Sequence, residues 1–270
     1  MQKLHGKIND FAQMCPFIKG FRYHQNKMLQ EFELKEKSNI NISSELKKEL
    51  EIWKNVISDS KKGFPIAKNL GEIPIFYVEN YSDAAGAAFN GEGGNIPKND
   101  ERGAASITFV NNKIYDCTTC SWSYKLICKF PHNSALLEII GLLLPFMTNP
   151  KVFKNKYVKC NVDNISLVFA WANKTVKSEY DLYKLLQILH IIEYAIPCKI
   201  FIDHSPRRSN WQTTLVDNLT RKHTTTEVDE NLIKNVVKHS LSGPLLNWIM
   251  NPDDELNVMK TIEHIVDKCN

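Results

Sequence analysis

The fold is decided by the stretch IFYVENYSD, residues 75–83, and by the elements that follow it along the chain. Its β-branched and aromatic residues predict a strand that ends at Asp83. A polar, glycine-containing loop is expected at residues 90–102. A predicted hairpin comes next, in which residues 105–110 and 113–123 flank the turn Asn111-Asn112. This part of the chain therefore begins as an antiparallel meander.

Helices and strands alternate after the hairpin. The pattern predicts helices at residues 134–147, from 165, at 179–195 and at 213–222, and strands at 157–163 and 198–203. An antiparallel meander followed by β-α-β crossovers predicts a mixed sheet covered by helices, which is an α/β fold. The segments on either side, residues 1–70 and 225–270, have helical patterns.

Composition excludes several classes of protein. Of the 270 residues 43% are hydrophobic and 24% charged, which is typical of a globular chain and excludes a disordered one. The net charge of +4 is compatible with a nucleic-acid partner. The seven cysteines lie mostly in apolar stretches, which favours reduced thiols in an intracellular protein of the cytoplasm or nucleus. No membrane partner is expected, because the most apolar stretch, residues 135–148, is too short to span a bilayer.

Four acidic residues occupy positions that suggest one shared site. Asp83 and Asp163 each end a predicted strand, and Asp217 lies within an apolar helical turn. Glu138 is the only charged residue between positions 133 and 150, on a helix whose other residues are mainly apolar. A carboxylate beside a buried face is costly unless it is paired, protonated or bound to metal. If Asp83 and Asp163 end neighbouring parallel strands, their carboxylates lie close together.

Clustered carboxylates point to metal chemistry. Hard oxygen ligands select Mg²⁺ or Mn²⁺ over softer metals, and two such ions about 4 Å apart support phosphodiester cleavage. Taken singly, each acid has an ordinary structural interpretation as a turn former, a helix cap or a surface residue. The order, element type and separation of the four favour the functional one.

Short blocks of sequence carry a further signal. They are YSDAA (81–85), NSALLE (133–138), NVDN (161–164), HSPRRSN (204–210) and VDNLTR (216–221). Together they resemble the ribonuclease H domain of retroelement reverse transcriptases, particularly those of DIRS-type elements. The last two blocks are similar to that family's His-x-Pro-x-x-x-Asn…Ala-Asp-x-Leu-Ser-Arg signature, although Val216 replaces its alanine.

The resemblance implies a domain organisation. Residues 71–224 would form a ribonuclease H-like domain with a five-stranded mixed sheet and helices on both faces. Residues 1–70 resemble the segment that links the polymerase thumb to that domain, and residues 225–270 would form a helical C-terminal extension. The expected partners are an RNA–DNA hybrid and a polymerase portion of the same polyprotein.

The resemblance also implies an activity and a set of residues. Asp83, Glu138, Asp163 and Asp217 would be catalytic and would hold two Mg²⁺ or Mn²⁺ ions. The reaction would be endonucleolytic hydrolysis of the RNA strand of an RNA–DNA hybrid, leaving a 5′-phosphate. The residues expected to contact nucleic acid are His204, Arg207, Arg208, Asn210 and Arg221.

Two alternatives remain open on the sequence. Val216 and the loop at residues 90–102 depart from the family pattern, which is compatible with a catalytically inactive module that binds nucleic acid or protein. A DNA-strand-transferring integrase shares the fold but uses three acids, the last of them a glutamate on a late helix. Asp217 beside an arginine-rich block favours ribonuclease H over an integrase.

Overall fold

The computed structural model describes most of the predicted elements. The described residues are 6–8, 10, 21–35, 41–60, 78–86, 103–122, 126, 134–173, 180–196, 198–221, 236–240, 247, 249–251 and 255–269. They belong to two compact units, which are Met1–Ile73 with Asn173–His190, and Pro74–Ala172 with Ile191–Asn270. The predicted loop at residues 90–102 lies outside the described residues.

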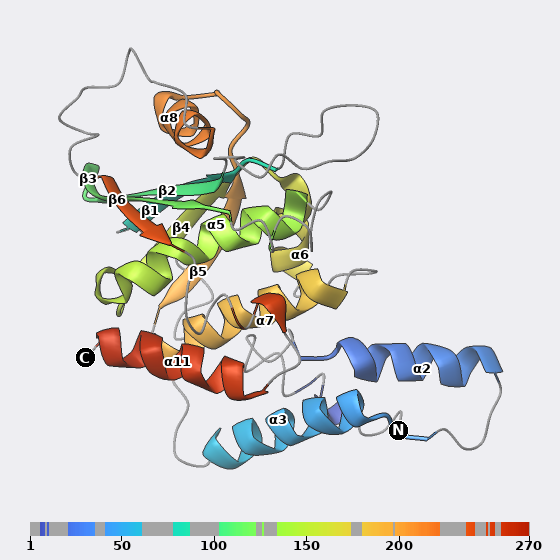
Figure 1. The fold of residues 1–270 in the computed structure, drawn as a ribbon. Coiled ribbons are helices and arrows are strands. Elements are labelled where there is room, and N and C mark those ends of the chain that lie inside the picture. Colours follow the sequence, from blue (N-terminus) through green and yellow to red (C-terminus); the bar gives the residue numbers. More distant parts are fainter. Residues whose placement is uncertain are drawn as a thin grey trace. The chain divides into compact units, whose positions relative to one another are not determined.

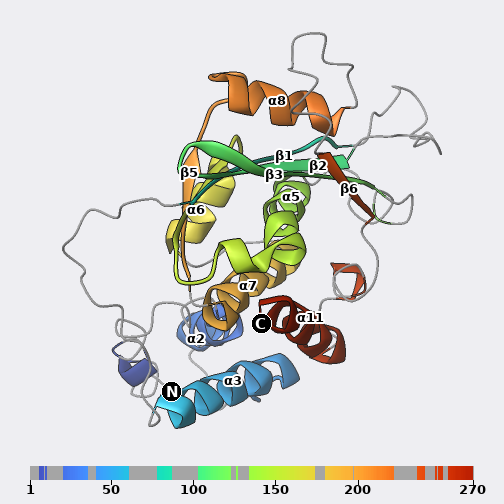
Figure 2. The ribbon, with the colours of Figure 1, turned by 90° about the vertical axis from the view of Figure 1, so that its left-hand side faces the viewer.

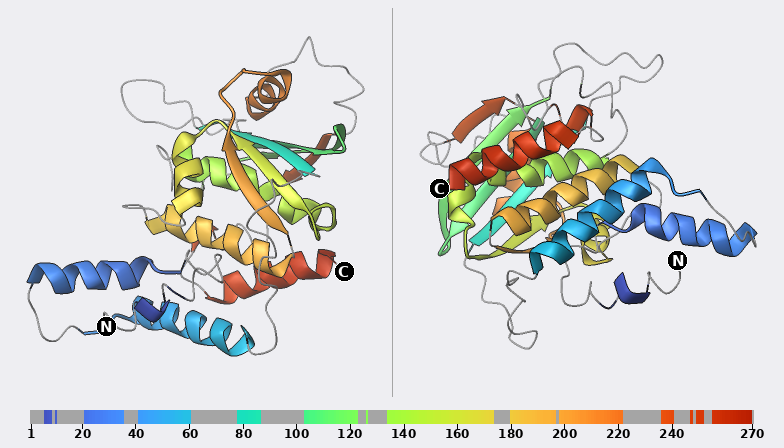
Figure 3. Two further views of the ribbon diagram at one scale, coloured as in Figure 1. Left: turned by 180° about the vertical axis from the view of Figure 1, so that it is seen from behind. Right: turned by 90° about the horizontal axis from the view of Figure 1, so that it is seen from below.

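The second unit is built on a six-stranded sheet (Figure 1). Its strands are β1 (Val78–Ala84), β2 (Gly103–Val110), β3 (Lys113–Ser121), β4 (Tyr157–Val162), β5 (Lys199–His204) and β6 (Val236–Ser240). They lie in the order β5-β4-β1-β2-β3-β6. β1, β2 and β3 form an antiparallel meander, and β4 and β5 run parallel to β1 (Figure 3, left). The mixed ribonuclease H-like sheet β3-β2-β1-β4-β5 is therefore confirmed.

Helices cover both faces of this sheet (Figure 2). α5 (Ser134–Thr148) and α8 (Trp211–Thr220) both pack on β1 and β2. Leu215 and Val216 of α8 pack against the face that carries Ala105 and Ile107. α5 lies beside Ala104, which points the opposite way because side chains alternate along a strand. The two helices thus enclose the centre of the sheet from opposite sides.

Three further elements also belong to this unit. They are the 3₁₀ turn η2 (Pro150–Val152), α6 (Ile165–Asn173) and α11 (Glu255–Cys269). The indole nitrogen of Trp171 in α6 donates a hydrogen bond to the carbonyl oxygen of Ile200 in β5, at 3.2 Å. Lys268 of α11 donates to the carbonyl oxygen of Met147 in α5, at 3.1 Å.

The parallel register of β1 and β4 sets the positions of two acidic residues. Tyr81 pairs with Asn161, so the row two residues further along holds Asp83 and Asp163. A second contact fixes the end of β1: the indole nitrogen of Trp122 donates a hydrogen bond to the carbonyl oxygen of Ala85, at 2.8 Å. Asp83 is the penultimate residue of β1, not its last.

A glycine allows α5 to approach β1 closely. A Cβ at Gly141 would lie 3.1 Å from the carbonyl oxygen of Asp83 and 3.4 Å from the Cβ of Ala104. Such contacts are tight, so a residue without a side chain suits this position. Glu138 lies one helical turn before Gly141, on the same side of α5, and is therefore brought to the end of β1.

The C-terminal extension differs from its prediction. Residues 225–270 were predicted to be helical, but Val236–Ser240 forms a strand, β6, which pairs in parallel with β3. The consecutive β-branched residues Val236 and Val237 favour a strand, and a partner strand supplies the hydrogen bonds. Glu255–Cys269 is helical, as predicted.

The first unit is a small group of helices around a buried carboxylate. It contains α2 (Tyr23–Lys35), α3 (Ser44–Ser60) and the part of α7 (Tyr180–Ala195) up to His190. Glu49 of α3 accepts hydrogen bonds from the backbone N–H groups of His24 and Gln25, at the start of α2, and from the hydroxyl of Tyr183 in α7. A carboxylate at a helix N-terminus is stabilised by unpaired N–H groups and by the helix dipole. The helical prediction for residues 1–70 agrees with α2 and α3.

Within the described parts of the chain, no helix combines the length and apolar character needed to cross a membrane.

The strand pair β2–β3 yields a stability prediction. A Cβ at Gly103 would overlap the backbone carbonyl oxygen of Cys120, so Gly103→Ala must separate the two strands. We expect this change to lower the free energy of unfolding by about 1–3 kcal/mol, the usual cost of overpacking. Gly86→Ala is the matched control, because its Cβ would meet only Leu137 Cδ1, at 3.8 Å. Urea unfolding of both variants measures the difference, and equal stabilities would contradict the prediction.

Candidate metal centre

Three of the four predicted carboxylates meet at one end of the sheet. Asp83, Glu138 and Asp163 each offer an oxygen, and these oxygens all lie within 4.8 Å of one another. Asp83 comes from β1, Asp163 directly follows β4, and Glu138 comes from α5. The register of β1 with β4 and the close approach at Gly141 are the local causes of this arrangement.

The surroundings of Glu138 and Asp83 disfavour their negative charges. Glu138 is 4% exposed, and its Oε2 atom has no hydrogen-bond partner. Burial raises the pKa of Glu138 well above its ordinary value, and the charges of Asp83 and Asp163 raise it further. Burial also raises the pKa of Asp83, to which the charge of Asp163 adds. Like charges held together in a buried site repel unless a cation neutralises them.

The donor set fits a hard divalent cation. All three ligands would be carboxylate oxygens, the type that Mg²⁺ and Mn²⁺ prefer. The unpaired Glu138 Oε2 atom is an available donor of this kind. Asp83, Glu138 and Asp163 are therefore the residues that would hold such an ion.

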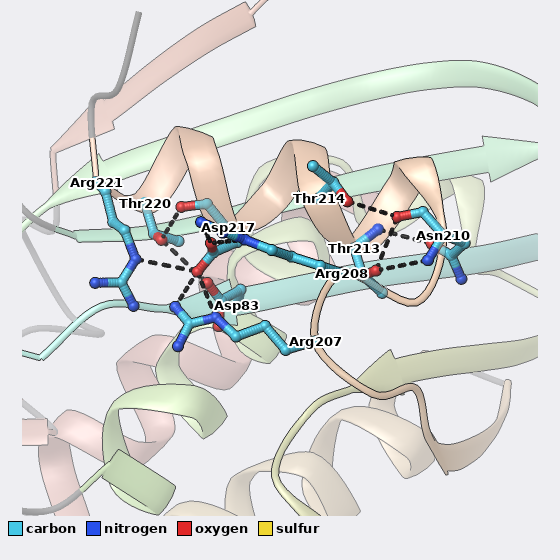
Figure 4. A network of polar contacts seen from close by, with 9 residues as sticks. All are labelled: Asp83, Arg207, Arg208, Asn210, Thr213, Thr214, Asp217, Thr220 and Arg221. Carbon is cyan, nitrogen blue, oxygen red and sulfur yellow. Dashed lines mark hydrogen bonds and ion pairs between the residues drawn. The ribbon is translucent and has the colours of Figure 1, made fainter. Parts of the chain in front are cut away.

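Asp217 is placed next to this cluster but is engaged elsewhere (Figure 4). Its carboxylate accepts hydrogen bonds from Arg207, Arg208 and Arg221. Burial raises the pKa of Asp217, but the hydrogen bonds from Arg207 and Arg221 outweigh it, so that the pKa is lowered overall. The structure therefore gives Asp217 an environment opposite to those of Asp83 and Glu138.

Thr220 connects the two environments, and the sequence analysis assigned it no role. Its hydroxyl lies 3.0 Å from Asp83 Oδ2 and 2.8 Å from the backbone carbonyl oxygen of Asp217 (Figure 4). The only sequence signal for this contact is the i, i+3 spacing from Asp217, which puts both residues on one face of α8.

The residues predicted to contact nucleic acid lie on the turn from β5 to α8 and at the end of α8. Arg207, Arg208 and Arg221 surround Asp217. His204 is the exposed last residue of β5 and pairs with Val162, the residue before Asp163. Asn210 is the N-cap of α8: its Oδ1 accepts from the backbone N–H of Thr213 at 2.8 Å. The side chain of Asn210 thus has a structural role at this helix start.

Comparisons with known proteins were made for the whole chain. No family model matches it, and no curated protein matches it. Solved structures similar to it include the N-terminal RNase H domain of a Mycobacterium tuberculosis protein, solved as a fusion with maltose-binding protein (TM-score 0.36, 14% identity, 54% of this chain and 93% of that chain). A second is LC11-RNase H1 in complex with an RNA/DNA hybrid (TM-score 0.37, 12% identity, 54% of this chain and 94% of that chain). A third is RNase H1 from the archaeon Halobacterium salinarum (TM-score 0.38, 11% identity, 54% of this chain and 96% of that chain).

The raised pKa values of the cluster predict how stability depends on pH. A carboxyl group whose pKa is raised on folding contributes stability below its unfolded pKa, and this contribution is lost as the pH rises through the folded pKa. Without metal, we therefore expect Glu138→Gln to be more stable than the wild type at neutral pH, by about 1–3 kcal/mol. The difference should shrink as the pH falls towards 4.5, the ordinary pKa of glutamate.

Urea unfolding in a chelator, at neutral pH and near pH 4.5, measures this difference. Saturating Mg²⁺ should reverse it, because a ligand that binds only the folded wild type at 100 times its Kd adds about 2.7 kcal/mol. Asp203→Asn is the control, because Asp203 lies at the end of β5 with its side chain 60% exposed. A Glu138→Gln variant less stable than the wild type at neutral pH without metal would contradict the prediction.

Proposed function

We propose that this chain is a divalent-metal-dependent endonuclease that hydrolyses the RNA strand of RNA–DNA hybrids. The observation that carries the proposal is the convergence of Asp83, Glu138 and Asp163 at one end of a ribonuclease H-like sheet. A bound Mg²⁺ or Mn²⁺ ion there supplies a water-derived nucleophile and neutralises charge that develops on the scissile phosphate.

The chain's own residues prepare the site for this reaction. The hydrogen bond from the indole of Trp122 to the carbonyl oxygen of Ala85 and the register with β4 fix the end of β1, so that Asp83 needs little rearrangement on binding an ion. Burial of Glu138 keeps water from satisfying its free oxygen, which strengthens its attraction for a cation. Preorganisation of this kind lowers the cost of stabilising charge in the transition state.

The finer parts of the proposal rest on the sequence blocks. Origin in a retroelement reverse transcriptase, with a polymerase portion of the same polyprotein as partner, is supported by residues 204–221. The resemblance also implies two ions with Asp217 as a ligand, whereas the three clustered carboxylates support one. Selection of RNA would come from contacts to 2′-hydroxyl groups near the scissile phosphate.

Cleavage of a labelled RNA–DNA hybrid in Mg²⁺ tests the proposal. We expect the wild-type chain to cut the RNA strand, and Asp83→Asn and Asp163→Asn to lower the rate by about a thousandfold, equivalent to several kcal/mol of transition-state stabilisation. Asp203→Asn, at an exposed position at the end of neighbouring β5, should keep its rate within about threefold.

Other outcomes of the same assay would favour the alternatives. A wild-type chain that binds the hybrid without cutting it would support an inactive binding module. Processing of DNA ends in place of hybrids would support an integrase-like activity. Cleavage that survives both aspartate substitutions would exclude the proposed metal centre.

A further inference from the structure

The carboxylate of Asp217 has no acceptor position left for a metal ion. Arg207 donates to its Oδ1 through Nε, at 2.8 Å, and through Nη2, and Arg221 donates to the same atom through Nε at 3.0 Å. Arg208 donates to Oδ2 through Nε and Nη2, at 3.1 and 3.0 Å. Without the Nη2 contact of Arg207, these are four N–H donors for a group that offers about four lone-pair positions. The residue is also only 1% exposed, so the arginines enclose it.

The local charge disfavours a second divalent cation at this carboxylate. Each of the three guanidinium groups contacts the carboxylate of Asp217, so these four groups by themselves have a net charge of +2, apart from the nearby carboxylates of Asp83 and Asp163. A divalent ion bound to Asp217 would lie within a few ångströms of three positive charges, which repel it. The same net charge attracts anions, and about two phosphates would neutralise it.

The arginines keep donors that face outward. Arg207 and Arg208 are 44% and 60% exposed, although both bind a fully buried carboxylate. A guanidinium group has five N–H donors, and Arg208 uses two of them on Asp217. The remaining donors lie in the planar arrangement that matches phosphate oxygens.

The turn that carries these arginines depends on Asp217 for its shape. Arg208 has a φ of 55°, a left-handed backbone conformation that costs a residue other than glycine on the order of 1 kcal/mol. Its two hydrogen bonds to Asp217 offset this cost. Asp217 therefore holds both the side chains and the backbone of the turn in place.

We propose that Arg207, Arg208 and Arg221 form a binding site for backbone phosphates of nucleic acid, and that Asp217 is the positioning residue of this site and not a ligand of a second metal ion. The choice of nucleic acid as the ligand rests on the proposed function. The metal centre then consists of Asp83, Glu138 and Asp163 and takes one ion.

Titration with Mn²⁺ alone tests the assignment of Asp217. We expect the wild-type chain to bind one ion at the centre, and both Asp217→Asn and the double variant Arg207→Gln/Arg208→Gln to bind one ion as well. Two ions in the double variant would mean that the arginines mask a second metal site, and would overturn the proposal. A loss of one ion in Asp217→Asn would also overturn it. The double variant keeps the test decisive if Asp217→Asn fails to fold, because glutamine side chains still offer N–H donors to Asp217 and Arg221 still pairs with it.

Hybrid binding in a chelator, where no metal-dependent cleavage occurs, tests the phosphate site. Arg207→Gln and Arg208→Gln should each weaken binding several-fold and lower the slope of log affinity against log salt by about one. Lys113→Ala is the control for a lost positive charge, because Lys113 is exposed at the far end of β3 from the site. Arginine variants that bind like this control would overturn the proposal.

The direction in which Asp217→Asn changes the affinity for the hybrid distinguishes a positioning role of Asp217 from an effect of its charge alone. Removal of a negative charge from beside the arginines should tighten hybrid binding if only net charge matters. Loss of positioning should weaken it, and we expect a weakening of at least about threefold. Tighter binding by the folded variant would overturn the positioning role. If the chain binds metal and hybrid as described but does not cut the hybrid, the proposed function is contradicted and this inference stands. If the chain cuts the hybrid but the arginine variants bind it as the wild type does, only this inference is overturned.

Discussion

Parallel pairing of β1 with β4 is the interaction on which the candidate centre depends. It joins strands that are about 80 residues apart in the chain and aligns the rows that contain Asp83 and Asp163. Side chains alternate in a strand, so a register shift of one residue would turn Asp163 to the other face of the sheet. The pairing brings two negative charges together, and the repulsion between them is a cost that the fold itself does not remove. A divalent cation would remove it, so the architecture and the proposed metal requirement follow from the same contact.

The buried carboxyl groups on the two sides of Thr220 have pKa values that are shifted in opposite directions. On one side, Asp83 and Glu138 have raised pKa values because burial and neighbouring negative charges disfavour ionisation. On the other side, Asp217 has a lowered pKa because hydrogen bonds from arginines outweigh its burial. The pKa of Arg207 is raised in turn, chiefly by its hydrogen bond to Asp217. Environments that shift the pKa values of neighbouring carboxyl groups in opposite directions indicate different roles for those groups. In the proposed metal centre the carboxylates would bind an external cation, whereas Asp217 binds arginines of the chain itself.

Local sequence patterns predicted much of the fold and the three carboxylates that the structure brings together, Asp83, Glu138 and Asp163. Glu138 is a lone charge in an apolar helix, and Asp163 follows an alternating strand, so both could be found without a structure. The arginine contacts of Asp217 could not be foreseen from composition, because they depend on a left-handed turn at Arg208, where glycine would have been the usual signal. Only Arg221, four residues after Asp217 on or beside the helix, follows a readable spacing. The strand β6 was missed because its partner, β3, lies more than 100 residues earlier, and no local pattern identifies such a pairing.

The different hydrogen bonding of these buried carboxylates also affects the stability of the domain. Asp217 is fully hydrogen-bonded by the protein's own arginines, whereas Glu138 Oε2 is buried without a partner. A buried polar atom that lacks a partner costs about 1–3 kcal/mol, which is a large fraction of the net stability of a domain. Replacing the glutamate by a neutral side chain would recover that free energy but would remove a donor that a cation needs. Buried polar groups without a partner commonly mark functional sites, and here Glu138 lacks one for its Oε2 atom, whereas Asp217 is fully hydrogen-bonded. The contrast supports a division in which the proposed metal-dependent chemistry lies on the α5 side of Thr220 and α8 orients the arginines.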